Sequence, residues 1–142
     1  MEITRLAALS DNYIFVLSDQ EQKIAAVVDP ALSQPVLELL HRQKLQLVAI
    51  FNTHHHRDDV GGNQALIEQF PQVCVYGGSE DRGRIPGQQV FLKDGDLVTF
   101  ADQEAEILFV PGHTRAHIAY YFPPQNDTDT GELFCGDTLF SG

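Results

Sequence analysis

The chain carries the stretch VAIFNTHHHRDDVGG at residues 48–62, in which an apolar run leads directly into three histidines and two aspartates. Residues 48–51 read as a buried strand, so the polar cluster follows the carboxyl end of that strand. Open α/β sheets bind their ligands at the carboxyl ends of the strands. Imidazole and carboxylate groups together suit zinc or iron. The stretch therefore predicts an α/β fold with a metal site at one edge of a sheet.

The spacing inside the cluster assigns different roles to its members. Side chains alternate along an extended backbone, so His54 and His56 face one side while His55 faces away. Asp58 follows this pair, where it can bind a second ion or accept a proton from water. The alternative interpretation is a solvated polar loop, which is the usual reading of a lone histidine. Three histidines and two carboxylates within six positions favour the metal site.

Length, charge and cysteine content restrict the class of protein. A chain of 142 residues is long enough for one domain with its own core. Nine Lys and Arg against twenty Asp and Glu give a net charge of −11, which argues against nucleic acid or an anionic membrane as a partner. Cys74 and Cys135 lie in apolar runs and are expected to be reduced core residues. Without a membrane-length apolar run or a signal-peptide pattern, we expect a cytoplasmic protein.

The first half of the chain alternates predicted strands and helices. A helix is expected to begin near Ser33, with Pro35 in its first turn, and Gly77-Gly78 is expected to end a strand. The expected elements are strands at 13–17, 23–28, 48–51 and 73–76, and helices after Ser33 and at 63–70. The second half is predicted to be mostly sheet. Strands at 90–92 and 97–100 form an expected hairpin around Asp94-Gly95, followed by strands at 106–110 and 118–122.

Two later strand ends supply the remaining candidate ligands. Residues 107–110 run into Pro111-Gly112-His113, and residues 132–135 run into Gly136-Asp137. The glycines allow close approach of the backbone, and a carboxylate at Asp137 can bridge two ions. Each motif alone is more often a turn or a loop. Their position behind the histidine cluster favours a shared site.

At this point the sequence resembles the metallo-β-lactamase superfamily, and within it the glyoxalase II (hydroxyacylglutathione hydrolase) family. The segments that carry the resemblance, in family order, are SDNYIF at 10–15, VDP at 28–30, THHHRD at 53–58, VGGN at 60–63, YGG at 76–78, PGHT at 111–114 and GDTLF at 136–140. The resemblance implies an α/β fold, the αββα sandwich, with metals at one sheet edge. It also implies hydrolysis of a small-molecule glutathione thioester, S-D-lactoylglutathione, to glutathione and D-lactate in methylglyoxal detoxification.

The resemblance further implies a set of metal ligands. The first zinc ion would be held by His54, His56 and His113, and Asp137 would bridge to a second ion. Asp58 would bind that second ion and act in catalysis, while Asp29 would support the ligands by hydrogen bonding. Two zinc ions are implied, with iron or manganese as alternatives.

Two features depart from the family pattern. Asp59 stands where the family has a histidine ligand of the second metal, so Asp58, Asp59 and Asp137 place up to three carboxylates around one ion. We expect the second site to be weakened or shifted toward harder ions. The sequence stops at Gly142, shortly after the bridging aspartate. Residues 1–142 are thus expected to be the N-terminal metallo-β-lactamase-like domain, with the sandwich incomplete in its second half and the C-terminal helical substrate-binding domain absent.

From these departures we expect impaired hydrolysis by this chain and self-association through exposed sheet. Two alternative functions follow from the same residues. One is a mononuclear-iron relative such as a persulfide dioxygenase, and the other is a non-catalytic metal-binding fragment. His41, His55 and His117 are assigned no role as ligands.

Overall fold

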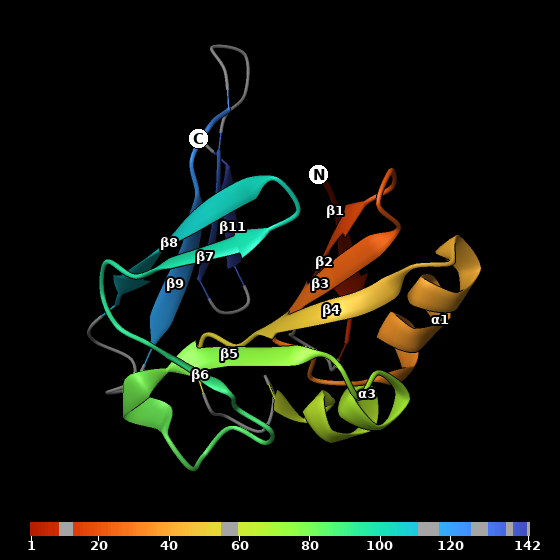
Figure 1. Cartoon of the computed structure of the whole chain (residues 1–142), viewed down its shortest axis with the longest axis horizontal. Coiled ribbons are helices and arrows are strands. Elements are labelled where there is room, and N and C mark those ends of the chain that lie inside the picture. Colours follow the sequence, from red (N-terminus) through yellow and green to blue (C-terminus); the bar gives the residue numbers. More distant parts are fainter. Residues whose placement is uncertain (9–12, 55–59, 111–116, 126–130, 136–137, 142) are drawn as a thin grey trace.

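The molecule contains two β-sheets, which Figure 1 shows facing each other with helices on one side. The computed structural model describes residues 1–8, 13–54, 60–110, 117–125, 131–135 and 138–141. Within these residues, the first sheet has six strands in the order β1-β2-β3-β4-β5-β6, and the second has five in the order β11-β10-β9-β8-β7.

The first sheet is antiparallel at one side and parallel at the other. Its strands are β1 (Glu2–Ala7), β2 (Tyr13–Asp19), β3 (Ile24–Val28), β4 (Gln46–Phe51), β5 (Cys74–Gly78) and β6 (Val90–Leu92). The first three strands pair antiparallel, and β3 to β6 pair parallel. Parallel neighbours require crossover connections. Helices α1 (Gln34–Gln43) and α3 (Asn63–Gln69) lie in two of them, so the carboxyl ends of β3, β4 and β5 share one edge.

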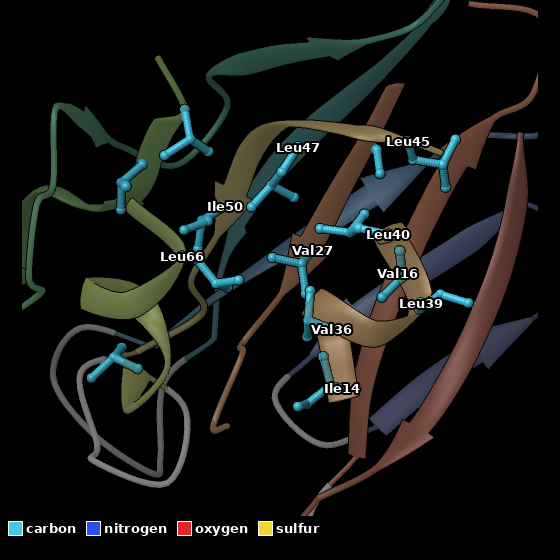
Figure 2. Packing of buried hydrophobic residues seen from close by; sticks show 14 of the residues in the cluster. Ile14, Val16, Val27, Val36, Leu39, Leu40, Leu45, Leu47, Ile50 and Leu66 are labelled. Carbon is cyan, nitrogen blue, oxygen red and sulfur yellow. The ribbon is translucent and has the colours of Figure 1, made fainter. Parts of the chain in front are cut away.

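Both helices bury apolar side chains on one face, and α1 also has residues that suit its ends. In α1, Pro35 is in the first turn, Val36, Leu39 and Leu40 are buried, and Lys44 ends the helix in the left-handed conformation. Leu66 of α3 is likewise buried. These side chains pack against the outer face of the first sheet, as Figure 2 shows. The labelled members of this outer cluster are Ile14, Val16, Val27, Val36, Leu39, Leu40, Leu45, Leu47, Ile50 and Leu66.

The second sheet is antiparallel throughout and encloses a second core against the first sheet. Its strands are β7 (Leu97–Phe100), β8 (Gln103–Phe109), β9 (Ile118–Phe122), β10 (Glu132–Cys135) and β11 (Thr138–Ser141). The largest side chains of this inner cluster are Phe15, Phe51, Phe100, Tyr120, Phe122 and Phe134. Adjacent residues of β4 contribute to different clusters, Ile50 to the outer and Phe51 to the inner. This burial of both faces explains the uninterrupted apolar run of β4.

The layers therefore run helix, sheet, sheet across the described residues, which confirms the predicted α/β sandwich class. Two predicted details are wrong. The first is the strand break at Gly77-Gly78, because β5 continues through both glycines and Gly77 pairs with Phe91. A Cβ atom on Gly77 would lie 2.5 Å from Cδ1 of Ile85. The glycine thus permits close packing within the strand instead of ending it.

The second wrong detail is the hairpin around Asp94-Gly95. β6 belongs to the first sheet and β7 to the second, so this turn carries the chain from one sheet to the other. The backbone N–H of Lys93 donates to Asp96 Oδ2 and that of Asp96 to the Lys93 carbonyl. Alternating apolar residues predict strands but do not say which sheet a strand joins. The true hairpin is β7–β8, which turns at Ala101 with a φ of 55°.

Strands β1 and β11 and the short 3-10 helix at Ser79–Asp81 were not predicted. Among the described residues, no helix is both long and apolar enough to cross a membrane. Cys74 and Cys135 are free thiols, and both are half-buried, so the prediction that they are core residues is wrong.

Candidate metal site

The polar residues that follow β4 are buried and fixed by backbone hydrogen bonds from both sheets. Asn52 and Thr53 are fully buried, and His54 is 8% exposed. The N–H of Asn52 donates to the carbonyl of Tyr76 on β5, at 2.9 Å. The N–H of Ile118 on β9 donates to the carbonyl of Thr53, also at 2.9 Å. The end of β4 is thus held between a strand of its own sheet and a strand of the facing sheet.

Asp29, at the end of β3, is the carboxylate that organises this edge. It is 1% exposed and has a φ of 50°, a left-handed conformation that aspartate tolerates better than most residues. Its Oδ1 accepts from the N–H of Thr53 at 2.8 Å, and its Oδ2 accepts from the Thr53 hydroxyl at 2.6 Å. Both carboxylate oxygens of Asp29 therefore accept hydrogen bonds from Thr53.

These bonds determine which nitrogen of a neutral His54 ring carries the proton. The Thr53 hydroxyl has a single hydrogen, which it donates to Asp29. The same oxygen lies 2.8 Å from Nδ1 of His54, so it accepts a hydrogen bond from Nδ1–H. In the neutral ring the lone pair then resides on Nε2. A histidine tautomer fixed by a carboxylate in this way is typical of metal-binding histidines. The lone pair on Nε2 of His54 is therefore suited to bind a metal ion.

His117, which was predicted to have no role, stacks on His54. The two ring centroids lie 4.8 Å apart and the ring planes differ by 12°. Nε2 of His117 lies 3.9 Å from Sγ of Cys135 at the end of β10. Its position four residues after His113, directly before a strand, was the only sequence signal for a place near the site.

Three more residues support the same edge from below. The hydroxyl of Tyr120 on β9 donates to the carbonyl of Asn52 at 2.8 Å, and Nδ2 of Asn63 donates to Oδ1 of Asn52 at 2.8 Å. Gly62 lies so close to the segment after β3 that a Cβ atom there would be 2.6 Å from the Pro30 carbonyl oxygen. Close packing therefore explains the second glycine of the VGGN motif, Gly62.

Burial at this edge shifts the pKa values of neighbouring acids. Burial raises the pKa of Tyr120 well above its ordinary value, and the charge of Asp29 raises it further. Burial likewise raises the pKa of the Cys135 thiol, with a second contribution from Asp29. Both groups thus remain neutral next to a buried carboxylate.

Of the predicted site residues, the structure describes His54 and Asp29. The other predicted ligands, His56, Asp58, Asp59, His113 and Asp137, lie outside the described residues, as does His55. Across the part of the chain that is described, no group of three or more His, Cys, Asp or Glu side chains is placed to hold an ion. His41, predicted to be no ligand, is exposed on α1.

Three described residues that adjoin the other candidate ligands in sequence nevertheless lie close together. His54 directly precedes residues 55–59, His117 directly follows 111–116, and Cys135 directly precedes 136–137. The contacts from His54 to His117 and from His117 to Cys135 join these three points. Three strand ends, those of β4, β9 and β10, therefore meet at one edge of the sandwich.

A family model described as the metallo-beta-lactamase superfamily matches residues 9–142. The chain belongs to the metallo-beta-lactamase superfamily. Membership confirms the family expected from the sequence motifs and implies metal binding by this domain. The matched residues include every candidate ligand named above.

Curated relatives of this chain are named hydroxyacylglutathione hydrolase. Those of Nostoc punctiforme and Microcystis aeruginosa are each 71% identical over 142 residues, which is all of this chain and 55% of the relative. The chain therefore spans about half the length of the curated relatives it matches.

Two solved structures share this fold. ETHE1 from Myxococcus xanthus is 26% identical with a TM-score of 0.70, over 86% of this chain and 54% of that one. The BLEG-1 B3 metallo-beta-lactamase has a TM-score of 0.74 at 21% identity, over 85% of this chain and 67% of that one. The second likeness concerns the fold alone.

Proposed function

We propose that this chain contains the metal-binding half of a thioester hydrolase acting on a glutathione thioester, S-D-lactoylglutathione. The relatives named hydroxyacylglutathione hydrolase, at about 70% identity, support this substrate class. Because they are nearly twice as long as the chain, the proposal concerns the site and its chemistry.

One observation carries the proposal, the hydrogen-bonded series Asp29, Thr53 and His54. The buried carboxylate fixes the threonine hydroxyl, and the hydroxyl fixes the histidine tautomer with its lone pair on Nε2. Burying a carboxylate is costly unless its oxygens are satisfied. Here Oδ1 accepts from the backbone N–H of Thr53, and Oδ2 accepts from the Thr53 hydroxyl that orients the His54 imidazole.

The proposed ligands of the first ion are His54, His56 and His113, with Asp137 shared between two ions. Asp58 and Asp59 are proposed for the second ion, and Asp58 also for proton transfer. Zinc is the proposed metal, with iron or manganese as alternatives at the carboxylate-rich second position. When bound, such ions lower the pKa of water and stabilise negative charge on the carbonyl oxygen. Because a thiolate is a good leaving group, the site would need no strong acid to protonate it.

The test is hydrolysis of S-D-lactoylglutathione by the 142-residue chain loaded with zinc, followed as release of free thiol. His54→Ala provides the baseline, and His41→Ala, changed at an exposed histidine of α1, provides the matched control. Because hydrolysis by this chain is expected to be impaired, we expect slow metal-dependent thiol release from the unchanged chain and from His41→Ala, and none from His54→Ala. Equal rates for all three proteins, each shown by circular dichroism to be folded, would contradict the proposal.

Two alternative functions remain predictions that the same preparation can distinguish. Iron retained in preference to zinc, with oxygen consumption on a persulfide substrate, would favour the dioxygenase. Tight metal binding without turnover of either substrate would favour a non-catalytic metal-binding domain.

A further inference from the structure

We infer that His117 is a positioning residue for His54, holding the imidazole of that ligand by stacking flat against its face. The inference rests on the proposed function, since it requires a metal ion at Nε2 of His54. The evidence is the close, nearly parallel arrangement of the two rings, with centroids 4.8 Å apart and planes within 12°.

The His117 ring can act as a support because its own position is fixed. The residue is 6% exposed. Its carbonyl accepts from the N–H of Val110 at 2.9 Å, and the next residue, Ile118, donates to the carbonyl of Thr53. Its Nε2 faces Sγ of Cys135 on β10. The backbone around His117 is therefore fixed by Val110 and Thr53, and its ring lies against Cys135 at the end of β10.

The stack supplies a restraint that the Thr53 hydrogen bond lacks. The torsion that turns a histidine ring has a broad energy well, so the ring rotates easily unless its surroundings prevent it. A single hydrogen bond at Nδ1 fixes one edge of His54 but still allows the ring to tilt about that edge. A flat neighbour against its face opposes this tilt. Nε2 of His54 then keeps one direction before the ion arrives, which reduces the cost of binding.

The same geometry argues against His117 as a ligand of the ion that His54 binds. A ring nitrogen directs its lone pair within the plane of its ring. In two nearly parallel, stacked rings the lone pairs lie in separate planes, so an ion in the plane of one ring is displaced from the plane of the other. Zinc requires histidine nitrogens that converge on it at about 2.0–2.1 Å. His117 can support the ligand in this arrangement without joining it.

The experiment compares two substitutions that differ in whether a flat ring is kept. His117→Phe retains a ring, whereas His117→Leu retains apolar volume without one. His41→Phe and His41→Leu are the matched controls at an exposed position. Zinc affinity is measured by competition with a chromophoric chelator, and thermal unfolding is measured on the metal-free proteins. The visible spectrum of the cobalt-loaded proteins reports the ligand geometry independently of activity.

We expect His117→Leu to lose about 10–100-fold in zinc affinity and to change the cobalt spectrum. His117→Phe and both His41 variants should bind zinc like the unchanged chain. His117→Gln, which is polar but has no ring, should behave as His117→Leu does, and it replaces that variant if the leucine protein fails to fold.

Two results would overturn the inference. One is unchanged zinc affinity in both ring-free variants, and the other is an equal loss in the phenylalanine and leucine variants, which would make the ring nitrogens responsible. Failure of the unchanged chain to bind zinc at all would instead overturn the proposed function, and the positioning role with it.

Discussion

The polar side chains near the two ends of strand β4 differ sharply in their exposure to solvent. At the amino end, Lys44 and Gln46 are exposed to solvent, and the nearby His41 is exposed on the last turn of α1. At the carboxyl end, Thr53 is fully buried and His54 is 8% exposed. Two histidines of one short βαβ segment thus have opposite environments.

Burial of polar side chains, with the loss of stability that it can cause, is thus found at the carboxyl end of β4 and not at its amino end. A polar group that loses water must recover its hydrogen bonds within the protein, and an isolated buried carboxylate is more costly still. The amino end avoids the cost by exposure. At the carboxyl end the buried groups hydrogen-bond to one another: Thr53 donates to Asp29, and His54 donates to the Thr53 hydroxyl. This arrangement orients the imidazole of His54.

The largest effect is expected from removing the buried aromatic side chain at the carboxyl end of β4. Phe51 is fully buried, and its ring contacts Tyr76 and Tyr120 at centroid distances of 5.2 and 5.0 Å. Phe51→Ala should lower the free energy of unfolding by about 3–5 kcal/mol, measured by urea denaturation. Phe109→Ala, at a side chain 42% exposed, is the control and should change it by less than about 0.5 kcal/mol. Similar losses for both would show that the inner core does not support this edge.

Asp29→Asn should have the next largest effect, on metal binding. The amide can donate to the Thr53 hydroxyl, which is then free to donate to Nδ1 of His54 and to leave the proton on Nε2. We expect zinc affinity to fall about 10–100-fold, measured by chelator competition. The control is Asp19→Asn, because Asp19 accepts two backbone hydrogen bonds in an exposed turn far from the site. Unchanged affinity in Asp29→Asn would contradict the tautomer argument.

Alkaline pH should destabilise the fold through two tyrosines near the carboxyl end of β4, the buried Tyr120 and the half-buried Tyr76. Burial raises the pKa of Tyr76 to about 12 and that of Tyr120 well above its ordinary value of 10. The unfolded chain therefore ionises first as pH rises above about 10, and it binds fewer protons than the folded chain. Each such tyrosine should lower the free energy of unfolding by up to about 1.4 kcal/mol per pH unit there. Denaturation at pH 9 to 11 measures the slope; a flat profile would contradict it.

Tyr120→Phe should have the smallest effect of the four. It removes the hydroxyl that donates to the Asn52 carbonyl but keeps the ring in the inner cluster. We expect a loss of about 0.5–1.5 kcal/mol at neutral pH and a shallower alkaline slope. Tyr121→Phe, on the same strand but half-buried, is the control. An unchanged alkaline slope would show that Tyr120 does not titrate as described.

Much of this architecture followed from local patterns in the sequence. The apolar run before His54, the helix with Pro35 in its first turn and the helix before Pro71 were predicted because each depends on residues close in sequence. The pairing of β6 with β5 instead of β7 was not predicted, because the sequence of a short apolar strand does not indicate which sheet it joins. Gly77 was misread because its packing partner, Ile85, lies eight positions away.

The predicted ligand set stays a prediction, and the residues that support the described part of the site were harder to predict. His54 was expected from its cluster, and Asp29 from the resemblance to the family. The stack of His117 on His54 joins residues 63 positions apart, on an arrangement that only the facing of the two sheets creates. The bond from the Tyr120 hydroxyl to the Asn52 carbonyl has the same origin. Residues that position a ligand from another strand leave little trace in a single sequence.

The central claim is that the carboxyl end of β4 is a metal site and the amino end is not. The most direct test is the zinc content of the unchanged chain, of His54→Ala and of His41→Ala, measured by elemental analysis after zinc loading and dialysis. We predict that His41→Ala retains as much zinc as the unchanged chain and that His54→Ala retains less. Equal zinc content in all three folded proteins would contradict it.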